Sequence, residues 1–218
     1  MARRTLAETT EWVVDSLKEV EQVSEVQILS EQVICVQRTK YDPFIAGIVS
    51  VNRVEADDIR PIVNSNHGVE IIANIPKEAF WTGEALKLAQ ANDTATGALG
   101  DLYRAIKLEN VRGFEPKETA FIERGLRQHS RIDAFVRVHD RLYRISRNGL
   151  PDLTVVMLNE YELTADHLRT ARDRYGRFSV AVITNPNGRG TTSAKDAADA
   201  LGAEVHNWKS FFARLNKE

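Results

Sequence analysis

The sequence has little cysteine and no long hydrophobic run. Its single cysteine, Cys35, lies in an apolar segment, where it cannot form an internal disulfide or belong to a metal-binding motif. We expect this thiol to be buried and inert, which fits a protein of the cytoplasm, where thiols stay reduced. No apolar stretch approaches the roughly 20 residues that span a membrane. We therefore expect no membrane among the partners.

Sequence motifs of the common enzyme classes are also missing. The five histidines lack the spacing of a metal site, and no serine, cysteine or histidine lies in a recognisable nucleophile motif. The chain has neither a Walker loop nor the glycine fingerprint of dinucleotide-binding folds. The 43% apolar and 28% charged residues are those of an ordinary globular protein, so composition alone favours no enzyme class.

An apolar pattern, in contrast, occurs twice, about 109 residues apart in a chain of 218 residues. Residues 56–60 read Ala-Asp-Asp-Ile-Arg, and residues 165–169 read Ala-Asp-His-Leu-Arg. Matched hydrophobic positions carry the repeat more than identities do. Self-similarity at a fixed spacing indicates repeated structural units. We predict an internal duplication with two α/β lobes, residues 1–108 and 113–218, related by a pseudo-twofold axis.

Hydrophobic periodicity predicts the same order in both lobes: a helix, three strands, a helix, a strand and a helix. In the first lobe the predicted helices cover 6–20, 57–66 and 82–91, and the predicted strands cover 26–29, 33–36, 44–51 and 69–75. In the second lobe the helices cover 117–129, 164–176 and 193–201, and the strands cover 135–138, 142–145, 153–158 and 178–184. A short strand from Val205 and a final helix at 209–215 close the second lobe.

Charge is divided unequally between the two halves. Residues 1–110 carry 11 basic and 17 acidic side chains, a net charge of −6, whereas residues 111–218 carry 18 and 14, a net charge of +4. The positive charge is concentrated in one predicted helix and one predicted hairpin, at Arg124, Arg127, Arg131, Arg137, Arg141, Arg144 and Arg147.

The spacing of these arginines predicts two basic faces. The first three share one helix face, because residues three and four apart are neighbours on a helix. Arg137, Arg141 and Arg147 share one sheet face, and Arg144 points to the other. Such a surface favours contact with DNA or RNA through the second lobe. The alternatives are a solvated charged surface, docking of one lobe on the other, and a partner protein.

The end of the chain has a pattern that resembles a known family. A buried strand is followed by a Thr-rich turn, an Ala-rich helix, a short strand and a terminal helix. The segments that carry this pattern are 179–184, Thr191–Lys195, Ala197, Ala198, Gly202–Val205 and Phe211–Leu215. They resemble the C-terminal part of restriction-endonuclease-like domains, especially the Mrr type. The resemblance implies two degenerate tandem copies of an α-β-β-β-α-β fold.

The chemistry of that family requires an Asp and a Glu-x-Lys, or a near variant, around Mg²⁺. Pro151-Asp152 resembles the family's Pro-Asp pair, but the strand position of the triplet is apolar in both lobes. Glu160 and Glu162 offer a Glu-x-Glu substitute. On one continuous strand, however, Asp152 would lie about 26 Å from Glu160. We therefore expect no catalytic residues, metal or cofactor, the alternative being a divergent Mg²⁺-dependent nuclease that uses these three carboxylates.

One loop has features of an anion site. Gly188, Arg189, Gly190, Thr191 and Thr192 follow a predicted strand and precede a helix, where backbone N–H groups attract anions. The alternative is an ordinary loop that ends in a helix cap.

Three functions therefore remain open. The first is a nuclease fold without nuclease activity that binds nucleic acid or a partner protein. The second is the divergent nuclease, and the third is a structural or interaction protein with no anionic ligand.

Overall fold

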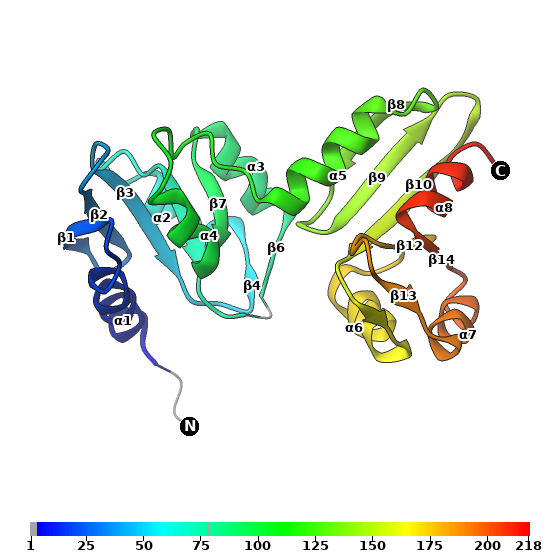
Figure 1. Cartoon of the computed structure of the whole chain (residues 1–218), viewed down its shortest axis with the longest axis horizontal. Coiled ribbons are helices and arrows are strands. Elements are labelled where there is room, and N and C mark those ends of the chain that lie inside the picture. Colours follow the sequence, from blue (N-terminus) through cyan, green and yellow to red (C-terminus); the bar gives the residue numbers. More distant parts are fainter. Residues whose placement is uncertain (1–3, 78) are drawn as a thin grey trace. The chain divides into compact units, whose positions relative to one another are not determined.

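The computed structural model in Figure 1 describes residues 4–77 and 79–218. The chain divides into two compact units, Met1–Pro116 and Lys117–Glu218. In each unit helices accompany a mixed five-stranded sheet, so the α/β class predicted from the sequence is confirmed. The division after Pro116 falls slightly beyond the joint between the two predicted lobes.

The first unit alternates helices and strands. Its elements are α1 (Leu6–Lys18), β1 (Val23–Ser30), β2 (Val33–Arg38), β3 (Phe44–Val49), β4 (Arg53–Val54), α2 (Ala56–Val63), β5 (Ile71–Asn74), β6 (Phe80–Trp81), α3 (Gly83–Ala91), β7 (Ala95–Ala98) and α4 (Leu99–Ala105). The sheet has the order β1-β2-β3-β5-β7. Its first three strands are antiparallel and its last three run parallel, while β4 and β6 form a separate short parallel pair.

The second unit has the same sequence of elements. They are α5 (Lys117–Gln128), β8 (Ile132–Arg137), β9 (Leu142–Arg147), β10 (Leu150–Leu158), β11 (Glu162–Leu163), α6 (Ala165–Tyr175), β12 (Val180–Ile183), β13 (Arg189–Gly190), α7 (Thr192–Ala200), β14 (Glu204–Asn207) and α8 (Trp208–Arg214). The sheet has the order β8-β9-β10-β12-β14, and β11 pairs with β13. The antiparallel and parallel pairs also fall in the same places.

The strand registers of the two sheets differ by one constant shift. Ala46 pairs with Ile71 in the first sheet, and Val155 pairs with Val180 in the second, so each partner moves by 109 residues (155 − 46 and 180 − 71). The same shift relates the antiparallel pairs β1–β2 and β8–β9 and the short pairs β4–β6 and β11–β13. The spacing found in the sequence therefore reappears in the backbone pairing of these strands.

The cores form where helices cover the sheets. In the first unit α1 and α4 contribute to a cluster on one face, and α2 and α3 contribute to a cluster on the other. In the second unit α5 and α8 pack on the sheet through Ile122, Leu126, Phe211 and Leu215, all of them buried. The neighbouring helices α6 and α7 lie together on the other side of this unit (Figure 1). This arrangement leaves the outer side of α5 open to solvent.

Besides the two-residue strands β4 and β6, the sequence pattern missed β7 and α4 of the first unit. The sequence predicted a short strand and a final helix only at the end of the second half, and not at the matching positions of β7 and α4. β7 was missed because its sequence, Ala-Thr-Gly-Ala, has a low intrinsic preference for a strand. β7 forms at the sheet edge through a parallel register with β5. Tertiary pairing thus overrides local propensity at this strand.

Candidate nucleic-acid interface

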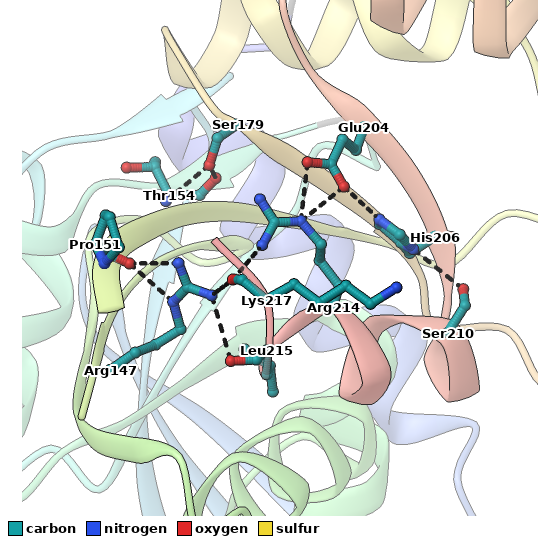
Figure 2. Close-up of polar contacts among 10 residues, drawn as sticks. All are labelled: Arg147, Pro151, Thr154, Ser179, Glu204, His206, Ser210, Arg214, Leu215 and Lys217. Atoms are coloured by element: carbon teal, nitrogen blue, oxygen red, sulfur yellow. Dashed lines mark hydrogen bonds and ion pairs between the residues drawn. The ribbon is translucent and has the colours of Figure 1, made fainter. Parts of the chain in front are cut away.

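Arg147 is a buried arginine that binds the end of the chain, as Figure 2 shows. Its side chain is only 5% exposed. Nε and Nη2 donate to the Pro151 carbonyl at 2.8 and 2.6 Å, while Nη1 donates to the Leu215 and Lys217 carbonyls at 3.3 and 2.6 Å. The guanidinium therefore ties the hairpin between β9 and β10 to the end of α8. This corrects the expectation that Arg147 belongs to an exposed basic face.

Arg38 makes the equivalent contacts in the first unit. It donates through Nε and Nη2 to the Asp42 carbonyl, and through Nη1 to the carbonyls of Ile106 and Leu108. The donor atoms and the acceptor positions match those of Arg147, shifted by 109 residues. Both guanidinium groups are thus engaged in holding a terminal helix of their unit, and neither presents its donors to an anionic ligand. We call this pair the arginine clamps.

The two other hairpin arginines expected on the basic face also have internal partners. Arg141 donates through Nη1 and Nη2 to the carboxylate of Glu118, with both distances at 2.9 Å. Arg137 donates through Nε to the Asp140 carbonyl at 2.9 Å. Arg144 alone of the strand β9 arginines is exposed. The predicted basic sheet face is therefore not formed.

Glu118 and Arg141 belong to a polar network at the carboxyl ends of β10 and β12. The Thr184 hydroxyl donates to Glu118 Oε1 at 2.8 Å. Burial opposes ionisation of Glu118, but its hydrogen bonds with Arg141, the charge of Arg141, and hydrogen bonds with Thr184 and Asn159 outweigh this effect and lower its pKa. The carboxylate is saturated with internal donors. We call this set the Glu118 network, and it holds the start of α5 against the sheet.

A second network unique to this unit attaches α8 to β14 (Figure 2). Glu204 accepts from His206 Nε2 and Arg214 Nε, each at 2.8 Å, and Ser210 Oγ lies 3.2 Å from His206 Nδ1. Serine, histidine and glutamate suggest a nucleophile triad, but the Glu204 carboxylate also accepts from the Arg214 guanidinium, which binds both of its oxygens. The Ser210 hydroxyl also donates to the Asn207 carbonyl. We interpret the group as a structural latch.

The helix arginines diverge from the predicted common face. α5 ends at Gln128, so Arg131 lies outside the helix, which corrects the expectation that it shares the helix face. Arg127 pairs with Glu123 and lies over the Phe135 ring, 5.6 Å from its centroid. Arg124 is exposed, and so is Arg131. Among the described residues, no acceptor is placed against the guanidinium of either one.

Aromatic rings form a row between α5 and α8. Phe121 is 48% exposed, and its ring centroid lies 4.9 Å from that of Trp208. Trp208 contacts Phe212 edge-on at 5.0 Å, and Phe212 lies 5.4 Å from His129. A Cβ at Gly125 would lie 2.6 Å from Trp208 Cζ2, so glycine at this position allows the indole to lie against α5. We call Phe121 and Trp208 the ring pair.

The charges around the ring pair are basic. Lys117 and Arg124 lie four residues before and three residues after Phe121, which places all three on one helix face. Both cations are exposed, as is Lys209, which follows Trp208. The arginine cluster predicted from the sequence did not include Lys117, Lys209 or either ring. The detectable signal was the 109-residue spacing, which aligns Glu8 with Lys117 and Asp15 with Arg124.

The three carboxylates of the alternative nuclease lie at different places. Asp152 is near the amino end of β10 and accepts from Ser146 Oγ at 3.2 Å. Glu160 follows the other end of β10 and lies 3.8 Å from His167, while Glu162 pairs with Arg189 at 3.4 Å. Within residues 4–77 and 79–218, no three His, Cys, Asp or Glu side chains are grouped so as to hold a metal ion.

The glycine loop uses its backbone groups internally. Gly188 N–H donates to the Asn185 carbonyl, Arg189 N–H to Tyr161 and Thr191 N–H to Leu163. A Cβ at Gly188 would lie 2.4 Å from the Glu160 carbonyl oxygen, so this glycine allows two backbone segments to approach each other. Thr191 caps α7 by accepting from the Ala194 N–H. Gly190, one residue earlier, belongs to β13 and pairs with Leu163 of β11. Thr192 begins the helix. The loop is therefore a capped connection.

Cys35 is half-buried, whereas the sequence predicted a buried thiol. Burial, together with the nearby Glu25 and Glu70, raises the pKa of the thiol. It therefore stays protonated and unreactive at neutral pH.

No protein-family model, curated protein sequence or solved structure matches this chain. In the part of the chain that the structure describes, no helix has the length and apolar character needed to cross a lipid bilayer.

Proposed function

We propose that the second unit binds nucleic acid without cleaving it, through the outer face of α5 and the start of α8. The observation that carries this proposal is a reversal of charge between matching helices. Glu8 and Asp15 on α1 are replaced, 109 residues later, by Lys117 and Arg124 on α5. All four side chains are exposed, so packing does not dictate their sign.

The position of Lys117 strengthens this argument. It is the first residue of α5, where a cation opposes the helix macrodipole, typically by about 0.3–1 kcal/mol. The matching Glu8 has the favourable sign and completes a capping box with Thr5. Lys117 is thus unfavourable for its own helix and has no packing role. Its positive charge therefore supports a negatively charged partner at this surface.

Apart from the short strands, both units have the element order helix, three strands, helix and strand, which resembles that of restriction-endonuclease-like domains. This order supports the proposal that the chain is a duplicated, degenerate pair of such units, although a shared fold does not by itself give a function. We also propose a cytoplasmic location, where the single thiol would stay reduced. The separated positions of Asp152, Glu160 and Glu162 favour binding without catalysis. Mg²⁺- or Mn²⁺-dependent cleavage that is lost in Asp152→Ala would instead support the nuclease.

The test is a salt series of binding measurements by fluorescence anisotropy, with labelled DNA and RNA. Wild-type affinity should fall steeply with salt, because each phosphate contact releases counterions. Lys117→Glu with Arg124→Glu should abolish binding at moderate salt. The control, Arg177→Glu with Lys195→Glu, reverses the same number of exposed charges elsewhere in the unit and should retain binding within a few-fold.

Two results would overturn the proposal. The first is a wild-type protein that binds neither DNA nor RNA at low salt, which would favour a protein partner or a purely structural role. The second is equal binding by the two double variants, which would mean that α5 does not form the interface.

A further inference from the structure

Phe121 and Trp208 make an unusual surface, because two aromatic rings are held in contact at a site that solvent reaches. The centroids lie 4.9 Å apart, and the ring planes are inclined by 38°. The close approach of the indole to Gly125 and its edge contact with Phe212 fix the orientation of Trp208. A rigid, solvent-accessible ring is suited to stacking with another flat ring.

The cations around the ring pair narrow the choice of ligand. Lys117 and Arg124 lie on the same helix face as Phe121, and Lys209 lies next to Trp208. Aromatic platforms combined with a positive groove are the arrangement that binds single-stranded nucleic acid, because bases stack on the rings while phosphates meet the cations. A duplex hides the faces of its bases and would use only the cations.

Building on the proposed function, we infer that the second unit selects single-stranded nucleic acid, with an unpaired base stacked on Phe121 and Trp208. The sugar–phosphate backbone of the strand then passes Lys117, Arg124 and Lys209. No base edge is read by a hydrogen bond in this arrangement. The selectivity is therefore for strandedness and not for sequence.

The first unit offers a natural comparison. Trp12 occupies the position of Phe121 and is 36% exposed, so an aromatic ring is present on both helices. Its surroundings differ, since Leu99 replaces Trp208 and acidic Glu8 and Asp15 replace the cations. Trp12 therefore has no second ring at that place, and the Arg4 guanidinium already lies over its ring, 5.3 Å from the centroid. We expect the first unit to take no part in stacking.

The experiment follows Trp208 fluorescence in full-length protein that carries Trp12→Phe. Trp81 is buried and supplies a constant background. An oligothymidine of 12 nucleotides should quench the emission saturably, because the stacked base contacts the indole. A blunt-ended DNA duplex, which has no unpaired loop bases, should bind about tenfold more weakly and quench little, since stacking is typically worth about tenfold or more per base.

A matched pair of variants separates stacking from charge. Phe121→Leu removes the ring but keeps an apolar side chain, and should weaken oligothymidine binding about tenfold while duplex binding and the salt slope stay unchanged. Trp12→Leu changes the corresponding position of α1 and should leave both affinities unchanged. Circular dichroism confirms that each variant is folded.

The outcomes distinguish this inference from the proposed function. If duplex and oligothymidine bind with equal affinity and Phe121→Leu has no effect, the strandedness inference is wrong while the basic interface stands. If neither nucleic acid binds, the proposed function is wrong and the inference is overturned with it. Quenching by an acidic peptide but not by oligothymidine would identify a protein partner for the ring pair and contradict both.

Discussion

The two units share a strand register and an arginine clamp, but they differ in surface charge and in polar networks. This comparison separates interactions that occur in both units from those that occur in one unit only. The clamps of Arg38 and Arg147 use the same donors on matching carbonyls. Thr82 and Thr191 likewise each cap a helix and donate to a carbonyl of the earlier short strand, Val54 in β4 and Leu163 in β11.

The Glu118 network, by contrast, has no counterpart in the first unit. The positions of Glu118, Arg141 and Thr184 are there occupied by Thr9, Gln32 and Ile75. The first unit forms its helix and sheet without this ion pair, so the fold does not depend on it. The network and the cations Lys117 and Arg124 all involve α5, whose matching positions in α1 are Thr9, Glu8 and Asp15.

The largest predicted effect concerns the clamps. Arg147→Met should destabilise the second unit by about 3 kcal/mol, because it removes the charged donor from one buried and three partly buried hydrogen bonds to carbonyl groups. Arg38→Met should have a smaller effect on the first unit, since Arg38 is only half-buried and water can replace part of its bonding. Urea denaturation, with hydrogen exchange of α8 and α4 to assign the loss, measures both. A neutral Arg147→Met would show that the repeated clamp does not support the fold.

The second largest effect should be a difference between the two units in their stability at acidic pH. The lowered pKa of Glu118 means that its contribution is complete above its ordinary pKa of 4.5 and is lost as pH falls through the lowered value. α5 should therefore open before α1 as the pH falls below about 4.5, as measured by hydrogen exchange. Glu118→Gln should destabilise the second unit by about 1–2 kcal/mol at neutral pH and remove much of this acid sensitivity.

A control is needed because Glu8 of α1 also has a lowered pKa, mainly through its hydrogen bond with the Thr5 backbone. That group is fully exposed at a helix start, so its protonation should affect only the first turn of α1. Opening of both helices at the same pH in wild type and Glu118→Gln would contradict the role given to the network.

The sequence predicted much of the fold because apolar spacing is a property of the buried face. The strands at 44–51 and 153–158 contain continuous apolar runs, and the structure places β3 and β10 there. Short strands such as β4 and β13 were missed because two residues carry no periodicity. The edge strand β7 was missed because its pairing with β5, and not its composition, makes it a strand.

The candidate interface was harder to predict than the fold. The sequence placed Arg147 and Arg124 on the same predicted basic surface. In the structure Arg147 is buried and donates to carbonyl groups, whereas Arg124 is exposed. A sequence does not reveal which cations have internal partners, since the acceptors of Arg147 lie up to 70 residues away. Matching positions in the two units predict the interface better than the number of arginines does, because residues with the same role in both units can be set aside.

A charge transplant gives a smaller expected effect and tests the comparison from the other side. Asp15→Arg with Glu19→Lys makes the exposed face around Trp12 basic without altering the capping residue Glu8. Affinity for oligothymidine at low salt should rise several-fold, and the salt slope should steepen by about 0.7 for each new phosphate contact. Anisotropy titrations at four salt concentrations provide the measurement. No change in slope would mean that charge on this helix face does not attract nucleic acid.

The smallest effect is expected for ion pairs that both units repeat at the surface. Arg60 lies 3.1 Å from Asp57, and Arg169 lies 2.9 Å from Asp166, in each case three residues apart on a helix. All four side chains are exposed to solvent, where such pairs typically contribute about 0.3–0.5 kcal/mol or less. Arg60→Ala and Arg169→Ala should therefore each change the free energy of unfolding by less than about 0.5 kcal/mol, as measured by urea denaturation. The arginine clamp and the exposed ion pair both occur in each unit, but only the clamp removes hydrogen-bond acceptors from water. Occurrence in both units therefore does not by itself indicate a contribution to stability. A loss above 1 kcal/mol in either variant would contradict that distinction, and it would require a further contact of the arginine within its unit.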